Sequence, residues 1–329
     1  MKKKTIIILA ILFLLALLAG LSLLTLLNTR TANSEPVRIY LPEGTTSETL
    51  RDTLMSSLPS RRHNPEIQII IRFMDYAADG RIKAGSYVVE PRMQALSLAR
   101  KLRNGQQDPV RLTIGKFRTP QQLNDYLNLK LMHDDFNFTL SSFHLVLPDT
   151  YEFYWTITPE AFMQRMEREY DNFWRQNTRP SGKIQDSQDS AKREIIILAS
   201  IVEEETNNQA EKPLIASVYL NRLKKGMPLQ ADPTVKYAVG DFSLRRILNK
   251  HLAMESPFNT YLHAGLPPAP ICLPSKATIN AVLNAPETHY LYFCASDKMD
   301  GTHRFAATLA EHSRNAAAFH HALNNRGIR

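Results

Sequence analysis

The chain has 329 residues, which is long enough for two domains and a sizeable hydrophobic core. Its formal net charge of +8 includes three lysines at residues 2–4, so the remainder of the chain is only mildly basic. The sequence has no zinc-finger spacing, no basic helix and no repeat of basic and aromatic residues, which argues against a nucleic-acid-binding protein.

Residues 5–27 form an apolar run without charge or proline. A helix of that length spans about 34 Å, enough to cross a bilayer core. A cleaved signal peptide is the alternative, but its apolar region has about 7–15 residues and a clear cleavage site, which this run lacks. Because lysines precede the run, we expect residues 1–4 to form a cytoplasmic tail and residues 5–27 a single inner-membrane span. The chain after Asn28 is then periplasmic.

The segment after the span divides into a short polar linker, residues 28–36, and a small α+β module, residues 37–105. Apolar and polar residues alternate in the strand-like stretches, and apolar residues recur with helical spacing in the others. A strand at 110–114 is expected to close this unit. The elements expected in the module are strands at 37–41 and 84–89 and helices at 45–57, 64–76 and 93–104.

Residues 106–329 are expected to form a second domain, so that the chain as a whole is of the α+β class. Its first part, 115–179, has mostly helical patterning, and a polar loop follows at 179–192. Beyond Gly226 the chain is punctuated by prolines and is expected to be rich in loops, which often build a binding cleft around a helical scaffold. Between these parts, helices are predicted at 191–205 and 212–225.

Cysteine and histidine usage gives little sign of a disulfide or a metal. Cys272 and Cys294 are the only cysteines, and an oxidising compartment permits them to pair, but their positions do not indicate whether they do. The ten histidines show neither the HExxH spacing nor a comparable arrangement of ligands. We therefore predict no metal site.

Three consecutive carboxylates, Glu203–Glu205, follow the strongly apolar run 195–198. Successive helical residues are about 100° apart, so the three side chains cannot share one face. Glu205 continues the apolar stripe of the helix and stands at its C-terminus, where the helix dipole disfavours negative charge. Apolar surroundings and a nearby carboxylate disfavour the charge further, which predicts the raised pKa of a general acid. A solvated glutamate cluster that ends a helix is the alternative.

Five motifs stand in order along the chain: LPDTY at 147–151, ASIVEEET at 199–206, LQADPTV at 229–235, SPFNTY at 256–261, and GLPP at 265–268 followed by PI at 270–271. Together they resemble the YceG-like family of endolytic murein transglycosylases. The resemblance covers essentially the whole chain. It implies one membrane span, a LysM-like module at 37–105 and a mixed α/β, loop-rich catalytic domain at 106–329.

The resemblance also implies a reaction and a setting. The reaction is cleavage of the MurNAc–GlcNAc bond inside peptidoglycan glycan strands, which leaves 1,6-anhydroMurNAc ends. The setting is the periplasmic face of the inner membrane, beside the peptidoglycan synthases as partners, where such cleavage terminates nascent strands. Whether the LysM-like module binds glycan is left open, as are the preferred strand length, the peptide-stem requirement and the oligomeric state.

The catalytic glutamate of the family is the last acidic residue of an Ile-Val-Glu-x-Glu stretch, which corresponds to Glu205 here. Glu203 corresponds to the first acidic residue. The middle position is commonly basic in the family and is Glu204 here, and its added negative charge is expected to raise the pKa of its neighbour. Phe258 stands where a tyrosine is common, so a hydroxyl contact is lost there.

A lytic transglycosylase needs only one carboxyl group, whereas ordinary glycosidases need two. The resemblance implies that Glu205 first protonates the glycosidic oxygen. As a carboxylate it then takes a proton from the C6 hydroxyl of the sugar, and this hydroxyl attacks C1. The ring closes as a 1,6-anhydro product without water and without a cofactor, and the tethered hydroxyl gains the advantage of an intramolecular reaction.

The remaining candidate site residues are polar side chains in the motifs. Gln230, Asp232 and Asn259 are candidates for holding the sugar. Asp232 precedes a proline, so its backbone is expected to be extended. Asp149 suits the cleft and a turn cap equally, and a turn cap is also the alternative for Asp232.

Two other readings compete with the lytic enzyme. One is a membrane-tethered peptidoglycan-binding scaffold without activity. The other is a two-carboxylate muramidase in which Asp232 or Asp149 is the partner of Glu205. The products distinguish the three: anhydro ends, no fragments, or reducing ends.

Overall fold

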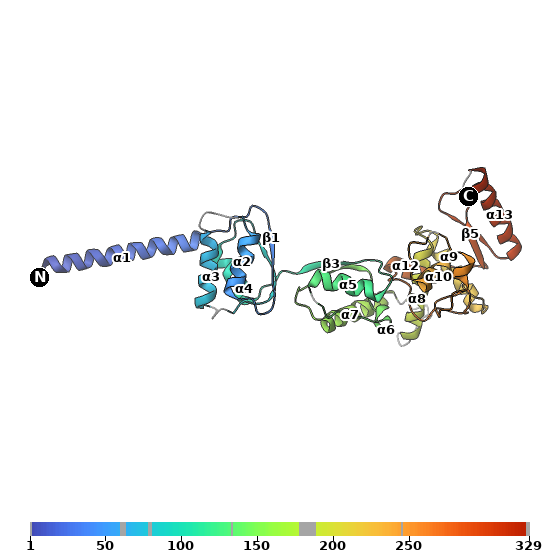
Figure 1. Cartoon of the computed structure of the whole chain (residues 1–329), viewed down its shortest axis with the longest axis horizontal. Coiled ribbons are helices and arrows are strands. Elements are labelled where there is room, and N and C mark those ends of the chain that lie inside the picture. Colours follow the sequence, from blue (N-terminus) through green and yellow to red (C-terminus); the bar gives the residue numbers. More distant parts are fainter. Residues whose placement is uncertain are drawn as a thin grey trace. The chain divides into compact units, whose positions relative to one another are not determined.

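The structure is a computed structural model and describes residues 2–59, 64–77, 81–132, 134–177, 189–244 and 246–326. The chain divides into two compact units (Figure 1). The first comprises Met1–Leu112 together with Glu152–Ile157, and the second comprises Thr113–Tyr151 together with Thr158–Arg329. Helices and strands occur in both units, which confirms the α+β class.

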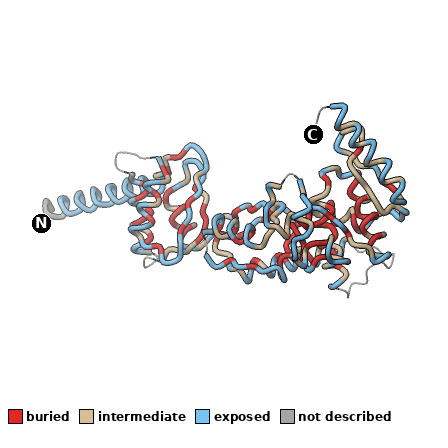
Figure 2. The backbone as a smooth tube through the Cα atoms, turned by 45° about the vertical axis from the view of Figure 1, so that its right-hand side comes forward, coloured by how far each residue is buried: buried red, intermediate tan, exposed pale blue. Residues whose placement is uncertain are grey.

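The first unit begins with the long helix α1 (Lys2–Asn28). Its segment Ile6–Asn28 has a mean hydropathy of 3.1, and none of the most apolar stretch is buried. Figure 2 shows this helix as a continuous exposed element. By length and composition the helix is able to cross a membrane, as predicted for this part of the chain.

The rest of the first unit is a small α+β module built on one pair of strands. β1 (Val37–Leu41) runs antiparallel to β2 (Gly85–Val89), with Val37 opposite Val89 and Leu41 opposite Gly85. Side chains alternate across a strand, so Ile39 and Leu41 point into the core that the helices cover. The helices are α2 (Ser47–Ser57), α3 (Pro65–Ala77) and α4 (Ala95–Asn104), close to the predicted ranges.

The polar segment after α1 is bound to this module by backbone hydrogen bonds. The Thr31 N–H donates to the Met93 carbonyl at 2.8 Å, and the Ala95 N–H donates to the Thr29 carbonyl at 3.0 Å. The Asn33 side chain is buried and donates to the Val89 carbonyl at 2.9 Å. The segment predicted as a linker is therefore an ordered part of the first unit.

The second unit is mostly helical. Its first strands, β3 (Val110–Ile114) and β4 (Asp149–Phe153), form a two-stranded sheet, and the boundary between the units runs across both strands. β5 (Tyr292–Ala295) and β6 (His303–Ala306) form an antiparallel hairpin. The helices are α5 (Pro120–Leu131), α6 (Leu140–Phe143), α7 (Pro159–Asn177), α8 (Asp189–Glu205), α9 (Lys212–Lys224), α10 (Asp232–Val239), α11 (Asn249–Leu252), α12 (Lys276–Leu283) and α13 (Leu309–Asn325).

The region after Gly226 contains more regular structure than predicted. Short helices, the β5–β6 hairpin and the 17-residue helix α13 interrupt the expected loops. The expectation of an extended backbone at Asp232 is also wrong, because α10 begins there with Pro233 in its first turn. Proline is tolerated at this place because the first N–H groups of a helix have no partner within the helix.

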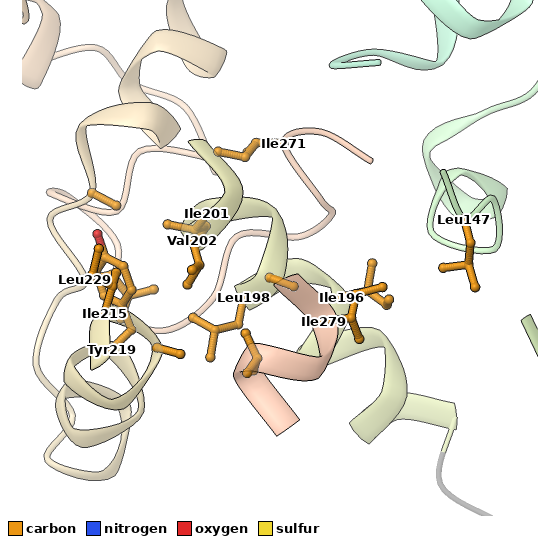
Figure 3. Close-up of a cluster of buried hydrophobic side chains, with 14 of the residues drawn as sticks. Leu147, Ile196, Leu198, Ile201, Val202, Ile215, Tyr219, Leu229, Ile271 and Ile279 are labelled. Carbon is orange, nitrogen blue, oxygen red and sulfur yellow. The ribbon is translucent and has the colours of Figure 1, made fainter. Parts of the chain in front are cut away.

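Helix α8 forms the centre of the core of the second unit. From Ile196 to Val202 all of its residues are buried, on every side of the helix. Figure 3 shows side chains of α8 close to Ile215 of α9 and Ile279 of α12. The one polar residue in this stretch, Ser200, donates to the Ile197 carbonyl at 2.7 Å and accepts the Ile271 N–H at 3.0 Å. A buried helix therefore leads directly to the three glutamates.

Candidate active site

The three glutamates at the end of α8 lie in three different environments. Because successive side chains are about 100° apart, each one meets a different set of neighbours. Glu203 faces α9 and α12, Glu204 faces the segment before α5, and Glu205 faces α9 and α10. All three keep partial exposure.

Glu203 is surrounded by hydrogen-bond donors. Its Oε2 accepts the Lys212 ammonium at 2.9 Å and the Ser275 hydroxyl at 3.0 Å, and it also accepts a very short hydrogen bond from Thr278. Burial alone raises the pKa of Glu203, but these donors and the charge of Lys212 outweigh burial and lower it. Glu203 is thus an ionised carboxylate that joins α8, α9 and α12.

Glu204 is held by two cations. Arg118 donates through Nε and Nη2 to its two carboxylate oxygens at 3.0 and 3.1 Å, and Lys116 Nζ lies 3.3 Å from Oε1. The guanidinium of Arg118 also lies 5.1 Å from the centre of the Phe242 ring. The expectation that Glu204 raises the pKa of Glu205 is not met, because the negative charge that does so is that of Asp232.

Glu205 differs from both. Among the described residues its side chain accepts one hydrogen bond, from the Tyr219 hydroxyl to Oε1 at 2.5 Å. Burial among protein atoms raises the pKa of Glu205 to about 7, and the charge of Asp232 adds to this effect, whereas the Tyr219 hydrogen bond and the charge of Lys236 oppose it. A carboxyl group with this pKa carries a proton on about half of the molecules at neutral pH, as a general acid requires.

Tyr219 is a site residue that the sequence analysis did not single out within the helix predicted at 212–225. Its side chain is buried, and its ring stacks edge-to-face on Phe293 with centroids 5.9 Å apart. Burial and the nearby Glu205 raise the pKa of its hydroxyl far above the usual value, so the group stays a neutral donor. A buried tyrosine hydroxyl usually needs a partner, and this was the signal in the sequence.

A second tyrosine holds the carboxylate at the start of α10. The Tyr261 hydroxyl donates to Asp232 Oδ1 at 2.6 Å, and the Asp232 side chain remains exposed. Thr260 ties the two loops together, since its Oγ1 accepts the Ala231 N–H at 3.0 Å and its carbonyl accepts the Gln230 N–H at 3.1 Å. The structure therefore places Asp232 and Tyr261 beside Glu205, whose charge acts on Tyr261.

Gln230 and Asn259 differ in their exposure to solvent. Gln230 is exposed at a left-handed backbone position with φ of 48°. Asn259 is fully buried, and its amide donates to the carbonyls of Leu252 and Met254 at 2.9 and 2.8 Å. Its Oδ1 accepts the Tyr261 N–H at 3.0 Å, so Asn259 shapes the loop that carries Tyr261.

Asp149 is linked to the Glu203 side of the helix rather than to Glu205. It is exposed at the start of β4 and lies 2.5 Å from Lys276 Nζ, which lowers the pKa of Asp149. Its Oδ1 also accepts the Thr150 N–H at 2.7 Å, which is a turn-type contact. Lys276 follows Ser275, the residue that donates to Glu203.

Two cavities lie along α8. One has a volume of about 810 Å³ and is lined at the start of the helix by Asp189, Arg193 and Ile197, without Glu205. The other has a volume of about 40 Å³ and lies beside Glu204 and Lys236. In the described ranges, no three histidine, cysteine, aspartate or glutamate side chains come together in a way that would hold a metal ion. Cys272 and Cys294 are both free thiols.

Comparison with known proteins gives consistent matches. A family model described as YceG-like matches residues 39–318. Two curated proteins, both called endolytic murein transglycosylase, are similar over part of the chain. The Bacillus subtilis protein is 46% identical over 120 residues, which are 36% of this chain and 32% of that protein. The Streptococcus pneumoniae D39 protein is 31% identical over 176 residues, 52% of this chain and 31% of that protein.

These matched segments span only about a third of each curated relative. A solved structure gives wider coverage. The crystal structure of a putative YceG-like protein from Listeria monocytogenes is 26% identical, with a TM-score of 0.51, and covers 86% of this chain and 99% of that one.

Proposed function

The chain belongs to the YceG-like family, and from this premise we propose that it is a membrane-anchored lytic transglycosylase. Its substrate is the MurNAc–GlcNAc bond inside peptidoglycan glycan strands, and its products carry 1,6-anhydroMurNAc ends. The observation that carries the proposal is the half-buried carboxyl group of Glu205, whose pKa is raised to about 7 at the end of a buried helix. The curated relatives called endolytic murein transglycosylase support the same reaction.

Glu205 is the proposed acid, and Tyr219 determines which of its oxygens carries the proton. In the described part of the chain the Tyr219 hydroxyl has one acceptor, Glu205 Oε1, so it donates to that oxygen. A neutral carboxyl group then keeps its own proton on the other oxygen. Oε2 of Glu205 is therefore the atom that we expect to deliver the proton to the glycosidic oxygen.

In the second half of the reaction, Oε2 of Glu205 accepts a proton instead of donating one. When the glycosidic oxygen takes the proton, the bond from MurNAc C1 to that oxygen breaks and GlcNAc leaves with a free 4-hydroxyl. The carboxylate of Glu205 then accepts the proton of the MurNAc C6 hydroxyl, whose oxygen forms the new bond to C1. One bond breaks, one forms, and Glu205 is protonated again, so no water or cofactor is consumed.

Asp232 and the loop residues have supporting roles in this proposal. The exposed carboxylate of Asp232, held by Tyr261, lies where it stabilises the positive charge that develops on the sugar ring. Gln230 is exposed beside it and binds sugar hydroxyls. Asn259 supports Tyr261 from within its loop, and Glu203 fixes the helix end. Asp149 acts at a distance, through Lys276.

The setting of the enzyme is also part of the proposal. Helix α1 supports an inner-membrane anchor, and the lysines before it support a cytoplasmic N-terminus with the catalytic domain in the periplasm. The module at 37–105, with two helices between its antiparallel strands, is proposed as LysM-like. Peptidoglycan synthases are the proposed partners, and termination of nascent strands the proposed outcome.

Product chemistry tests the proposed function. Long uncrosslinked glycan strands are incubated with the full-length protein in detergent, and an early time point is analysed by mass spectrometry. We expect a spread of internal fragments whose MurNAc ends are one water lighter than hydrolysed ends. Reducing MurNAc ends would instead favour the muramidase with Asp232 as second carboxylate, and no fragments would favour an inactive scaffold.

A further inference from the structure

Helix α10 presents two opposite charges beside the proposed acid. Asp232 and Lys236 are four residues apart and therefore lie on one face of the helix. The charges of both act on the carboxyl group of Glu205, so both lie close to it. Asp232 has a partner, the Tyr261 hydroxyl at 2.6 Å. Lys236, by contrast, is half-buried, and its ammonium group makes neither a hydrogen bond nor an ion pair within the ranges that the structure describes.

The surroundings of Lys236 carry charges of both signs, since Asp232 and the carboxyl group of Glu205 lie close to it and Glu204 lines the same cavity. Lys236 lines the cavity of about 40 Å³ together with Arg118. Arg118 and Lys116 both form ion pairs with Glu204. Lys116 and Arg118 thus share the carboxylate of Glu204, whereas the Lys236 side chain has no such partner among the described residues. An unpaired cation in a partly buried position is unfavourable unless an anion completes the site. The remaining lining residues of the cavity are Pro233, Tyr237, Phe242 and Ile271.

The proposed substrate carries a suitable anion in only one part. The glycan backbone of peptidoglycan is neutral, whereas the peptide stem on each MurNAc carries free carboxylates. A helix rises about 1.5 Å per residue, so Lys236 stands about 6 Å along α10 from Asp232. The cavity has room for a carboxylate group, since a single water needs about 10–15 Å³.

We propose that Lys236, with Arg118 behind it, forms a subsite for a carboxylate of the peptide stem on the MurNAc at the cleaved bond. This inference rests on the proposed function. A charge-assisted hydrogen bond from Lys236 to the stem orients the sugar over Glu205, so that strands with anionic stems are cleaved faster than strands with neutral stems. It also makes Lys236 a specificity-determining residue and not a proton donor.

Binding of the stem has a second consequence at the acid. The positive charges of Lys236 and of the buried Arg222 in α9 both oppose the raised pKa of Glu205, but Arg222 is already bound to the carbonyls of Leu291 and Leu229. A carboxylate bound to Lys236 offsets the charge of this lysine, so the pKa of Glu205 rises further when the substrate is in place. The substrate with an anionic stem thus helps to keep its own acid protonated.

The test compares three forms of the same strands with the full-length protein: native stems, stems whose carboxylates are converted to amides, and strands from which the stems are removed. The readout is the rate of formation of anhydro ends at low substrate, which reports kcat/KM. For the wild type we expect a loss of about 10-fold on amidation and a similar loss on removal of the stems. For Lys236→Gln, the three substrates should be cleaved at similar rates, and Lys236→Arg should restore the preference.

An exposed lysine at the end of α9 provides the matched control, and Lys224→Gln should keep the full preference for native stems. The subsite is overturned if the wild type cleaves amidated strands as fast as native strands, or if Lys236→Gln slows all three substrates equally. A different outcome is that the wild type cleaves stem-free strands as fast as native strands and amidated strands slowly. That result would show that Lys236 binds the carboxylate of the lactyl group, which stem removal exposes, and would overturn the proposed binding of the stem. Absence of anhydro ends on native strands would overturn the proposed function itself, a different result.

Discussion

Glu203 and Glu205 are two residues apart on one helix end, yet their surroundings have opposite effects. Around Glu203, three donors from α9 and α12 converge on one carboxylate oxygen and lower its pKa. Around Glu205, burial dominates over a single donor and raises the pKa to about 7. The comparison shows that the donors around a carboxylate, and not its burial alone, decide whether its pKa falls, as for the ion-paired Glu203, or rises, as for Glu205, the proposed acid.

The two carboxylates also affect stability in opposite directions. The lowered pKa of Glu203 means that its contribution is present above the pKa of the unfolded chain and is lost as the pH falls. The raised pKa of Glu205 means that its contribution is present at low pH and is lost as the pH rises through about 7. Glu203 thus favours the fold at neutral pH, whereas Glu205 is a site at which stability is given up for a reactive proton.

The largest expected effect is on Glu205 itself. Glu205→Gln keeps the size of the side chain but removes the titratable proton, so turnover should fall by at least about 100-fold. The rate of anhydro-end formation measures the loss, and circular dichroism checks that the fold survives. Glu203→Gln is the paired variant and should have a smaller effect on turnover. Near-normal turnover in Glu205→Gln together with a loss in Glu203→Gln would reverse our assignment of the acid.

Removal of the cation beside Glu203 should have the next largest effect, on stability. Lys212 is buried and binds both Glu203 and Thr278. Lys212→Met leaves a carboxylate without its counter-charge, and we expect the free energy of unfolding to fall by about 3 kcal/mol. Denaturant unfolding of the full-length protein in detergent measures this free energy.

Two further variants sharpen that result. Addition of Glu203→Gln to Lys212→Met should recover part of the stability, because the unpaired charge is then gone. Lys224→Met, at the exposed end of the same helix, should change little. A Lys212→Met protein as stable as the wild type would mean that Glu203 does not depend on its ion pair.

Loss of the single donor to Glu205 should have an intermediate effect. The 2.5 Å hydrogen bond from Tyr219 lowers the pKa of Glu205. Because Tyr219→Phe removes this hydrogen bond, the pKa of Glu205 should rise in the variant. The proposed mechanism requires protonated Glu205, and the alkaline limb of the pH–rate profile should therefore move to higher pH. The rate at pH 7 should fall about 10-fold, since the proton is no longer confined to Oε2.

Tyr170→Phe is the control for this variant, because Tyr170 is a buried tyrosine of α7 that packs on Trp174. Its pH profile should match that of the wild type. An alkaline limb that stays in place or moves to lower pH in Tyr219→Phe would show that the tyrosine does not act through the proton of Glu205.

The smallest effect is expected at the carboxylate between the two. Glu204→Gln retains an acceptor for Arg118, and the charge of Glu204 is not among those that act on Glu205. We expect turnover to change by less than about 3-fold and the free energy of unfolding by about 1 kcal/mol. A shift of the alkaline limb to lower pH in this variant would restore the original expectation that Glu204 raises the pKa of Glu205.

The sequence predicted the parts of this site that depend on local spacing. The apolar pattern predicted α8 almost to the residue, and the position of Glu205 on its apolar stripe predicted a raised pKa. The strands and helices of the small module followed from periodicity in the same way. These features depend on neighbours within one turn or one strand, which the order of residues specifies directly.

The partners of the glutamates were not predicted because the fold brings them from elsewhere in the chain. Arg118 and Glu204 are 86 residues apart in sequence, and Tyr261 and Asp232 are 29 apart. Tyr219 fitted an apolar stripe, and only its buried hydroxyl indicated a polar partner. The helix at Asp232 was missed because a bias against helix before proline does not hold where the proline occupies the first turn.

Direct titration of the two carboxyl groups tests the account most directly. The protein is labelled with glutamate carrying ¹³C at the side-chain carboxyl, and Glu205→Gln and Glu203→Gln identify the two resonances. We predict that the Glu205 resonance titrates with a pKa of about 7 and that the Glu203 resonance titrates below the usual glutamate value. Titration of Glu205 near the usual value, or of both groups together, would contradict the claim that the fold makes one of these carboxylates an acid and the other an ion pair.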